Sequence, residues 1–271
     1  MVRPAPSGTL DDLVADLVAE HETLLGLVTA LSSDGWDAPT PAEGWAVRDQ
    51  ISHLAFFDDL AALAMRDPAA FAPVAEAAVA AMASGDDPMA EHLARGRSVS
   101  GAELLRWWDD ARRALVEAVP AVAPGARVPW FGPPMSTMSF LSARLMETWA
   151  HGQDVADALG AARPPSDRLV HVARLGVRSR PFSFAVRGLD DPPGTVQVVL
   201  TSPEGEEWSF AEGDDDDEVR GPILDFCLVV TQRRHVGDTA LVVRGPVARQ
   251  WMAVAQAFAG PPGPGRPRRG A

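Results

Sequence analysis

Apolar residues up to Gly160 recur every three to four positions, which is the period of an amphipathic helix. Four such runs predict long helices over about residues 10–31, 47–65, 100–119 and 137–159. Residues 70–95 are rich in alanine and are predicted to be helical in pieces, with a break at 84–88. Segments 36–44 and 120–134 contain proline and glycine and are predicted to be loops. Four long helices joined in this way favour a helical bundle.

The ends of these helices carry recognisable signals. Thr9 followed by Asp12 is typical of a helix N-cap with an acidic first turn, and Ser100 begins the capping-box pattern S-x-x-E. We expect the second helix to end before Pro68, because the residue preceding a proline is pushed out of the helical region. Gly160 is a suitable stop for the fourth helix.

Beyond residue 160 the apolar pattern changes and indicates a second domain of strands and helices. Short strands are predicted at 182–186, 196–200, 207–210 and 240–245, a hairpin turn at 203–205, and helices at 169–178, 223–233 and 247–259. The acidic run 214–218 is interpreted as a solvated loop, because it lacks EF-hand spacing.

The predicted fold class is therefore α+β, with two domains. The helical bundle spans 9–162, a smaller α+β domain spans 166–260, and the Pro/Gly/Arg-rich tail 261–271 is predicted to be disordered. Residues 1–8 are predicted to be a loose leader.

Composition and charge argue against several classes of partner and site. The net charge of −13 and a pI of about 4.8 argue against a nucleic-acid partner. Cys227 is the only cysteine, which excludes a disulfide framework and a multi-cysteine metal site. The first ten residues lack the apolar core of a signal peptide, and no apolar run is long enough to span a membrane. We expect a cytoplasmic protein with no membrane partner, as a monomer or a homodimer.

Three residues form a candidate metal site. Glu147 and His151 are four apart on a predicted helix and therefore share one face. If His53 approaches from another helix, the set suits zinc best, with nickel, iron or cobalt as alternatives, and it leaves a coordination position open. At that position an ion can lower the pKa of a bound water or thiol, or polarise a carbonyl. The competing interpretation is a surface carboxylate and two unrelated histidines.

Other polar and aromatic residues have simpler interpretations. Asp154 either orients a ligand or is an exposed helix carboxylate, and Trp45 and Trp149 either wall the pocket or belong to the core. His21 and Cys227 are expected at the edge of the core or within it. The residues expected at the surface or in loops are His92, His171, His235, Asp58 and Asp59.

Two stretches resemble the signatures of the mycothiol-dependent maleylpyruvate isomerase family, which belongs to the DinB-like metal-binding bundles. They are P-A-E-G-W-A-V-R-D-Q-I-S-H-L at 41–54 and E-T-W-A-H-G-Q-D-V at 147–155. The resemblance implies that His53, Glu147 and His151 are the metal ligands. Segments 225–234 and 239–245 are similar to the C-terminal α+β domain of an actinobacterial subgroup.

The resemblance also implies a catalytic arginine in that C-terminal domain, for which Arg233 and Arg234 are the candidates, each with a structural ion pair as its alternative. The expected function is a metal-dependent enzyme that activates mycothiol or another small thiol for isomerisation, addition or transfer on a small unsaturated or carbonyl substrate. A thiol-independent isomerase or lyase of specialised metabolism, and a metal- or small-molecule-binding module without turnover, are the alternatives.

Overall fold

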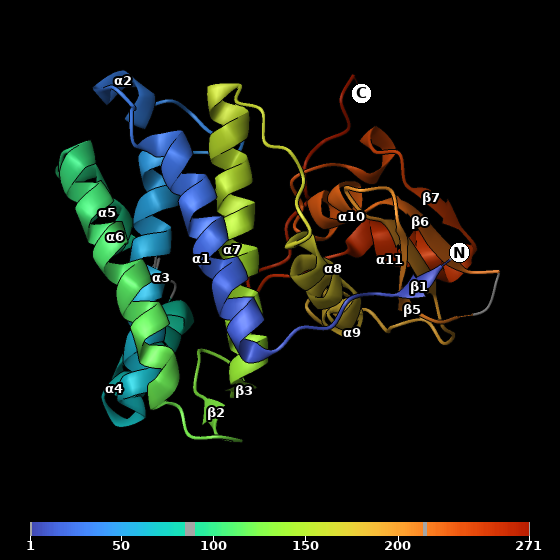
Figure 1. Cartoon of the computed structure of the whole chain (residues 1–271), viewed down its shortest axis with the longest axis horizontal. Coiled ribbons are helices and arrows are strands. Elements are labelled where there is room, and N and C mark those ends of the chain that lie inside the picture. The colour runs from blue at the N-terminus through green and yellow to red at the C-terminus, as the bar shows by residue number, and fades with distance from the viewer. Residues whose placement is uncertain (1, 85–89, 214–215, 271) are drawn as a thin grey trace. The chain divides into compact units, whose positions relative to one another are not determined.

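The computed structural model describes residues 2–84, 90–213 and 216–270 (Figure 1). The chain divides into two compact units, each with its own core. The first is Thr9–Ala162, and the second combines the segment up to Gly8 with the chain from Arg163 onward. The protein is therefore of the mixed helix-and-strand class that the sequence predicts.

The first unit is a helical bundle. Its helices are α1 (Leu10–Val28), α2 (Ser33–Trp36), α3 (Val47–Arg66), α4 (Pro68–Ser84), α5 (Ala90–Ser98), α6 (Gly101–Ala118) and α7 (Thr137–Leu159), with a 3-10 turn at Val119–Ala121. A two-stranded antiparallel ribbon is formed by β2 (Arg127–Val128), which lies in the predicted loop 120–134, and β3 (Met135–Ser136), which directly follows it. The four long helices are those that the sequence predicts. Of the predicted break at 84–88, residues 85–88 lie outside the described ranges.

The helix ends form as their side chains dictate. The hydroxyl oxygens of Thr9 and Ser100 accept hydrogen bonds from the backbone amides of Asp12 and Glu103. In return, the backbone amides of Thr9 and Ser100 donate to the carboxylates of the same two residues, so both capping boxes are present. Gly160 adopts the left-handed conformation, with φ 59°, that ends a helix at low cost. No described helix is long and apolar enough to cross a membrane.

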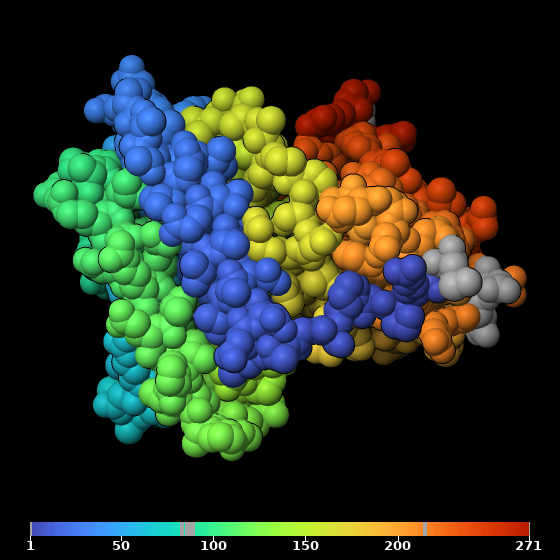
Figure 2. All heavy atoms as spheres, viewed as in Figure 1, coloured from blue at the N-terminus to red at the C-terminus, as the bar shows by residue number. Residues whose placement is uncertain are grey.

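The core of the bundle is built from apolar side chains on four helices. Leu24 of α1, Ile51 and Leu54 of α3, Trp108 of α6 and Val155 of α7 are fully buried in one cluster. Burying each such side chain contributes about 1.5–3 kcal/mol. In Figure 2 the atoms of α1 adjoin those of α6 and α7 on the face in view. Packing of α3 against α6 and α7 places the first signature beside the second.

Helix α5 lies very close to α3. A Cβ at Gly96 would come within 2.4 Å of the Ser52 Cβ, so a glycine is required there. Arg48 reaches across from α3 and donates hydrogen bonds of 3.2 Å to the carbonyl oxygens of Gly96 and Val99. This contact brings the buried His92 of α5 next to the α3 residues that follow Ser52.

The second unit is a five-stranded mixed sheet with helices. Its order is β1 (Arg3–Pro4), β5 (Glu207–Ala211), β4 (Gln197–Thr201), β6 (Glu218–Pro222) and β7 (Val242–Arg244). The β1–β5 and β4–β6 pairs are parallel, and the β4–β5 and β6–β7 pairs are antiparallel. The helices are α8 (Leu169–Arg178), α9 (Arg180–Ala185), α10 (Ile223–Val230) and α11 (Pro246–Val254), with a 3-10 turn at Val236–Asp238.

Helices α8 and α10 pack on each other and on the sheet. A Cβ at Gly176 would come within 2.8 Å of a Val230 methyl, so this glycine lets the two helices approach closely. Cys227 is fully buried on α10, as predicted, and burial raises the pKa of its thiol well above the usual value.

Two predictions for this unit are wrong. Residues 182–186 alternate like a strand, but Arg180–Ala185 is a helix, with Pro181 in its first turn and Phe184 buried. Residues 1–8 are not a loose leader, because Arg3–Pro4 pairs with β5. The acidic run 214–218 lies partly outside the described residues, and its last residue already begins β6. Residues 261–270 contain no helix or strand, and their disorder stays a prediction.

Candidate metal centre

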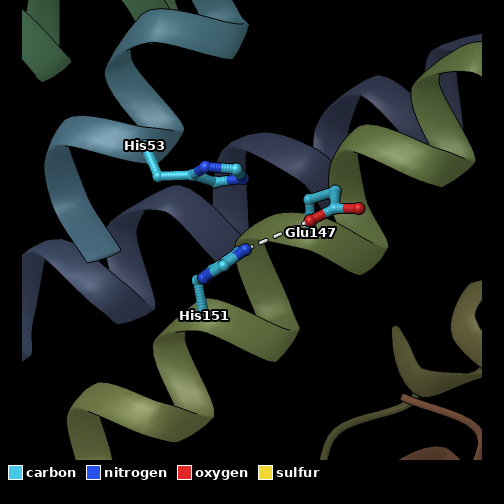
Figure 3. A group of neighbouring side chains, drawn as sticks. All are labelled: His53, Glu147 and His151. Carbon is cyan, nitrogen blue, oxygen red and sulfur yellow. Dashed lines mark ion pairs between the residues drawn. The ribbon is translucent and has the colours of Figure 1, made fainter. Parts of the chain in front are cut away.

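His53, Glu147 and His151 meet in the first unit, as the sequence predicts (Figure 3). His53 projects from the second turn of α3, and the other two project from one face of α7. One ligand atom from each residue lies within 4.8 Å of the other two. His151 Nε2 is 3.2 Å from Glu147 Oε2, and the two imidazole centroids are 4.5 Å apart. Three donors from two helices therefore converge on one point.

The donor set fits a divalent ion such as zinc. Two imidazoles and one carboxylate are common ligands of catalytic zinc, which binds them at about 2.0–2.2 Å. Ligands at that distance from one tetrahedral ion lie about 3.5 Å apart, so small side-chain rotations would bring the three donors into range. The side chains of Glu147 and His151 are 21% and 11% exposed, which leaves access for a small molecule. These are the residues that would hold the ion.

A buried polar side chain contacts one of the histidines from behind. Gln50 lies one turn before His53 on α3 and has no exposed surface. Its Oε1 forms a short hydrogen bond with His151 Nδ1, and its Nε2 donates to Thr40 Oγ1 at 2.9 Å. The ring of the candidate ligand His151 is thus held at Nδ1, and its Nε2 stays directed toward Glu147.

Aromatic rings flank both histidines. The Trp45 ring is stacked on His151, with centroids 5.9 Å apart and planes 18° apart, and lies 5.3 Å from His53. Phe57, one turn after His53, has its centroid 4.6 Å from the His53 ring. The loop residues Trp130 and Phe131 contact Phe57 in turn, with ring centroids 6.1 and 6.0 Å from that of Phe57. The centre is therefore bordered by apolar ring surface.

Trp45 also lines a cavity of about 530 Å³ in the same unit. Thr40, Arg48, Asp49 and Arg97 are among the other lining residues, and none of the three candidate ligands is among those described there. Trp45 therefore borders both the cavity and the metal centre. Trp149 is buried, at 4% exposure.

Three expectations for polar residues are wrong. His92 is buried and its ring centroid is 5.6 Å from that of His53, because α5 packs closely on α3. Asp58 is fully buried and accepts hydrogen bonds of 3.0 and 2.8 Å from Arg144. His171 is buried on α8.

Of three other polar residues, two are exposed and one is buried. His235 and Asp59 are exposed, as expected. Asp154 is buried, at 1% exposure, rather than an exposed carboxylate.

Two neighbours of the site were not predicted, although their spacing from His53 is a signal for them. Gln50 is three residues before His53 and Phe57 is four after it, so both lie on the same face of α3. His92 carries no such signal, because its position depends on the approach of another helix.

The candidate arginines lie in the second unit. Arg233 and Arg234 follow α10 in a tight turn, where both backbone amides donate to the Leu228 carbonyl oxygen. The turn contains Gln232 with φ 59°, and Arg233 Nη1 donates to the Thr231 carbonyl at 2.7 Å. Their role in a reaction stays a prediction.

The family model of the mycothiol maleylpyruvate isomerase N-terminal domain matches residues 17–156. This range contains all three candidate ligands and both signatures, so the resemblance seen in the motifs is confirmed. Two uncharacterised proteins of Mycobacterium tuberculosis, from strains CDC 1551 / Oshkosh and ATCC 25618 / H37Rv, are similar along almost the whole chain. Each is 47% identical over 253 residues, which cover 93% of this chain and 97% of the relative.

Two solved structures share the fold. The crystal structure of the mycothiol-dependent maleylpyruvate isomerase has a TM-score of 0.58 and 15% identity, covering 89% of this chain and 95% of that one. A histidine-to-alanine mutant of the same enzyme has a TM-score of 0.59 and 14% identity, covering 90% and 99%. At this identity the likeness concerns the fold, which extends over both units.

Proposed function

Because the chain belongs to the family of the mycothiol maleylpyruvate isomerase N-terminal domain, we propose that it is a metal-dependent isomerase. It would use mycothiol or another low-molecular-weight thiol on a small unsaturated substrate. The convergence of His53, Glu147 and His151 is the observation that carries this proposal. Their partly open position is what a catalytic site requires, since a structural site would be closed by a fourth side chain.

The three residues would hold a divalent ion, for which zinc is the first candidate. That ion would supply the positive charge that lowers the pKa of a nearby thiol. The side chains around them shape the site. Trp45 is stacked on the ring of His151, and Phe57 packs at a tilted angle against the ring of His53, so apolar ring surface replaces water on one side of each imidazole. Electrostatic interactions in such an apolar setting are stronger than in water.

The reaction needs no redox partner. The thiolate sulfur forms a bond to one carbon of an activated double bond, and the displaced electron pair moves onto the adjacent carbonyl oxygen. The former double bond is now a carbon–carbon single bond, and rotation about it changes the geometry of its substituents. The electron pair then returns from the oxygen, the carbon–sulfur bond breaks, and the double bond re-forms in the other geometry. The thiol leaves unchanged. We extend the proposal to Arg233 or Arg234 as the group that binds a substrate carboxylate, on the strength of the family resemblance.

The test combines metal content with turnover. We expect about one zinc per chain in the purified or reconstituted protein, and thiol-dependent isomerisation of maleylpyruvate. His53→Gln and Glu147→Gln should lose both the metal and the activity. His235→Gln and Glu76→Gln change the same residue types at exposed positions and should retain both.

Two results would overturn the proposal. A native chain that takes up no metal on reconstitution would exclude a metalloenzyme. Metal binding without turnover of any unsaturated acid, with or without mycothiol, would instead indicate a binding module.

A further inference from the structure

We propose that Gln50 is a positioning residue that holds His151 in the tautomer with its proton on Nδ1, so that Nε2 presents its lone pair to the metal position. The inference rests on the proposed metal centre for its purpose, but on the hydrogen bonds of the protein itself for its evidence. Thr40 and the backbone of Trp45 complete the chain of hydrogen bonds.

The direction of this chain follows from its outer end. The Trp45 carbonyl oxygen can only accept, and it accepts from both the backbone amide and the hydroxyl of Thr40, each at 2.8 Å. The single hydroxyl proton of Thr40 is thereby committed. Thr40 Oγ1 can then only accept from Gln50, so the amide group facing it is Nε2.

The orientation of the amide decides the state of the histidine. With Nε2 toward Thr40, Gln50 presents Oε1 to His151, and an oxygen acceptor requires a proton on Nδ1. A neutral imidazole carries one proton, so Nε2 is left with its lone pair. That atom is the one 3.2 Å from Glu147 Oε2, on the side where the three ligands converge.

The opposite arrangement is disfavoured by the same network. If the amide were reversed, His151 would carry its proton on Nε2 and donate it to Glu147, and could not bind a metal through that atom. The reversal would also take the Thr40 hydroxyl away from the Trp45 carbonyl. Gln50 is fully buried, so an unmatched amide group would find no water to replace its partner.

The loop that carries Thr40 and Trp45 is itself held in place. Pro39 and Ala46 form an isolated antiparallel bridge that closes it. The Ala46 amide donates to Asp49 Oδ2 at 2.8 Å, and Arg97 clamps Asp49 with bonds of 2.8 and 3.2 Å while also donating to the Gly44 carbonyl. The loop that anchors these hydrogen bonds is therefore fixed before any metal ion binds. Residues that hydrogen-bond to a metal-binding side chain usually serve to orient it in this way.

The first measurement is the His151 tautomer in the metal-free, full-length protein. Long-range ¹H–¹⁵N spectra distinguish the two ring nitrogens, and we expect the wild type to show the Nδ1–H form. Gln50→Leu should shift His151 towards the Nε2–H form, because Glu147 then offers the nearest acceptor. Gln50→Glu keeps an acceptor oxygen and should restore the Nδ1–H form, which a merely structural role would not explain.

The second measurement is zinc affinity, by competition with a chromophoric chelator. Loss of a partner behind a ligand typically weakens binding about 10–100-fold, and we expect a loss in that range for Gln50→Leu, with Gln50→Glu close to wild type. Thr40→Val should weaken binding in the same direction and Thr40→Ser should not. If Gln50→Leu does not fold, the Thr40 pair provides the same test.

Gln153→Leu is the matched control. Gln153 lies on α7 two residues beyond His151, on the other side of the helix, and donates to Asp157 at 2.9 Å. It should change neither the tautomer nor the affinity.

The two measurements also separate this inference from the proposed function. A wild type that binds no zinc but shows the tautomer shift would keep the role of Gln50 and remove the enzyme. An Nε2–H tautomer in the wild type, or Gln50→Leu with unchanged tautomer and affinity, would overturn the inference while leaving the metal centre standing.

Discussion

At the scale of the residue, the bundle contains a second group of buried charges away from the metal ligands. Asp58 accepts from Arg144, and His21 Nε2 lies 3.9 Å from Asp58 Oδ2. Burial and, to a smaller extent, the guanidinium groups of Arg112 and Arg144 lower the pKa of His21 to about 3. Burial also raises the pKa of Asp58, an effect that Arg144 opposes. His21 is therefore neutral in the folded protein at physiological pH.

This burial predicts a pH-dependent loss of stability. In the unfolded chain His21 takes up a proton below its ordinary pKa of 6.5, whereas the folded chain does not until about pH 3. The contribution is therefore complete above pH 6.5 and is lost as pH falls. Between pH 7.5 and 5.5 it should decrease by roughly 1 kcal/mol.

Urea unfolding at the two pH values measures this loss. The His21→Gln variant should lack that part of the pH dependence, while His235→Gln, at an exposed site, should keep it. Equal pH dependence in the wild type and His21→Gln would show that His21 is protonated in the folded state.

At the scale of the element, the long helices of the bundle follow from local signals, whereas β1, β6 and α9 of the second unit do not. Strand β1 contains a proline and only two residues, so no pattern predicts it. It exists because β5 offers an open edge, where the Ala5 amide donates to the Ser209 carbonyl at 2.9 Å. Helix α9 replaces a predicted strand because a five-residue alternation is too short to outweigh tertiary packing.

Arg174 on α8 anchors the chain just after β1. Its Nη2 donates to the carbonyl oxygens of Ala5 and Pro6. Hydrogen bonds from a charged donor contribute about 1.5–3 kcal/mol, so Arg174→Gln should lower the free energy of unfolding of this unit by about that amount and speed hydrogen exchange in β5. Arg178→Gln, one turn along α8 and exposed, removes only a positive charge near Arg174 and should not destabilise the unit. Equal effects of the two variants would mean that β1 is not held by Arg174.

At the scale of the whole molecule, the candidate metal ligands and the candidate catalytic arginines belong to different units of the chain. All three candidate ligands, together with Gln50 and Thr40, belong to the first unit, and the candidate arginines belong to the second. The N-terminal segment crosses this division, because its strand β1 is part of the second unit.

This division predicts that metal binding and substrate binding can be separated by mutation. Arg233→Ala or Arg234→Ala should leave the zinc content at the wild-type value. The variant that removes the carboxylate-binding group should lower kcat/KM by about 10–100-fold, the equivalent of one charge-assisted hydrogen bond. Arg249→Ala on α11 is an exposed control. Unchanged kinetics in both variants would leave the two arginines with a structural role only.

The sequence by itself determined the features whose causes are local. The four long helices follow from apolar period and capping residues, and the shared face of Glu147 and His151 follows from one helical turn. The two signatures also indicate the family, and their resemblance implies His53 as the third candidate ligand.

Only the tertiary structure decided which distant residues meet. The burial of Asp58 and His92, the pairing of β1 and the bond from Gln50 to His151 all depend on the approach of elements far apart in the chain. Burial and hydrogen-bond partners are properties of such contacts, and residue type and spacing do not specify them. For the same reason His53 could be expected at the site from the sequence, but its 4.5 Å approach to His151 required the packing of α3 on α7.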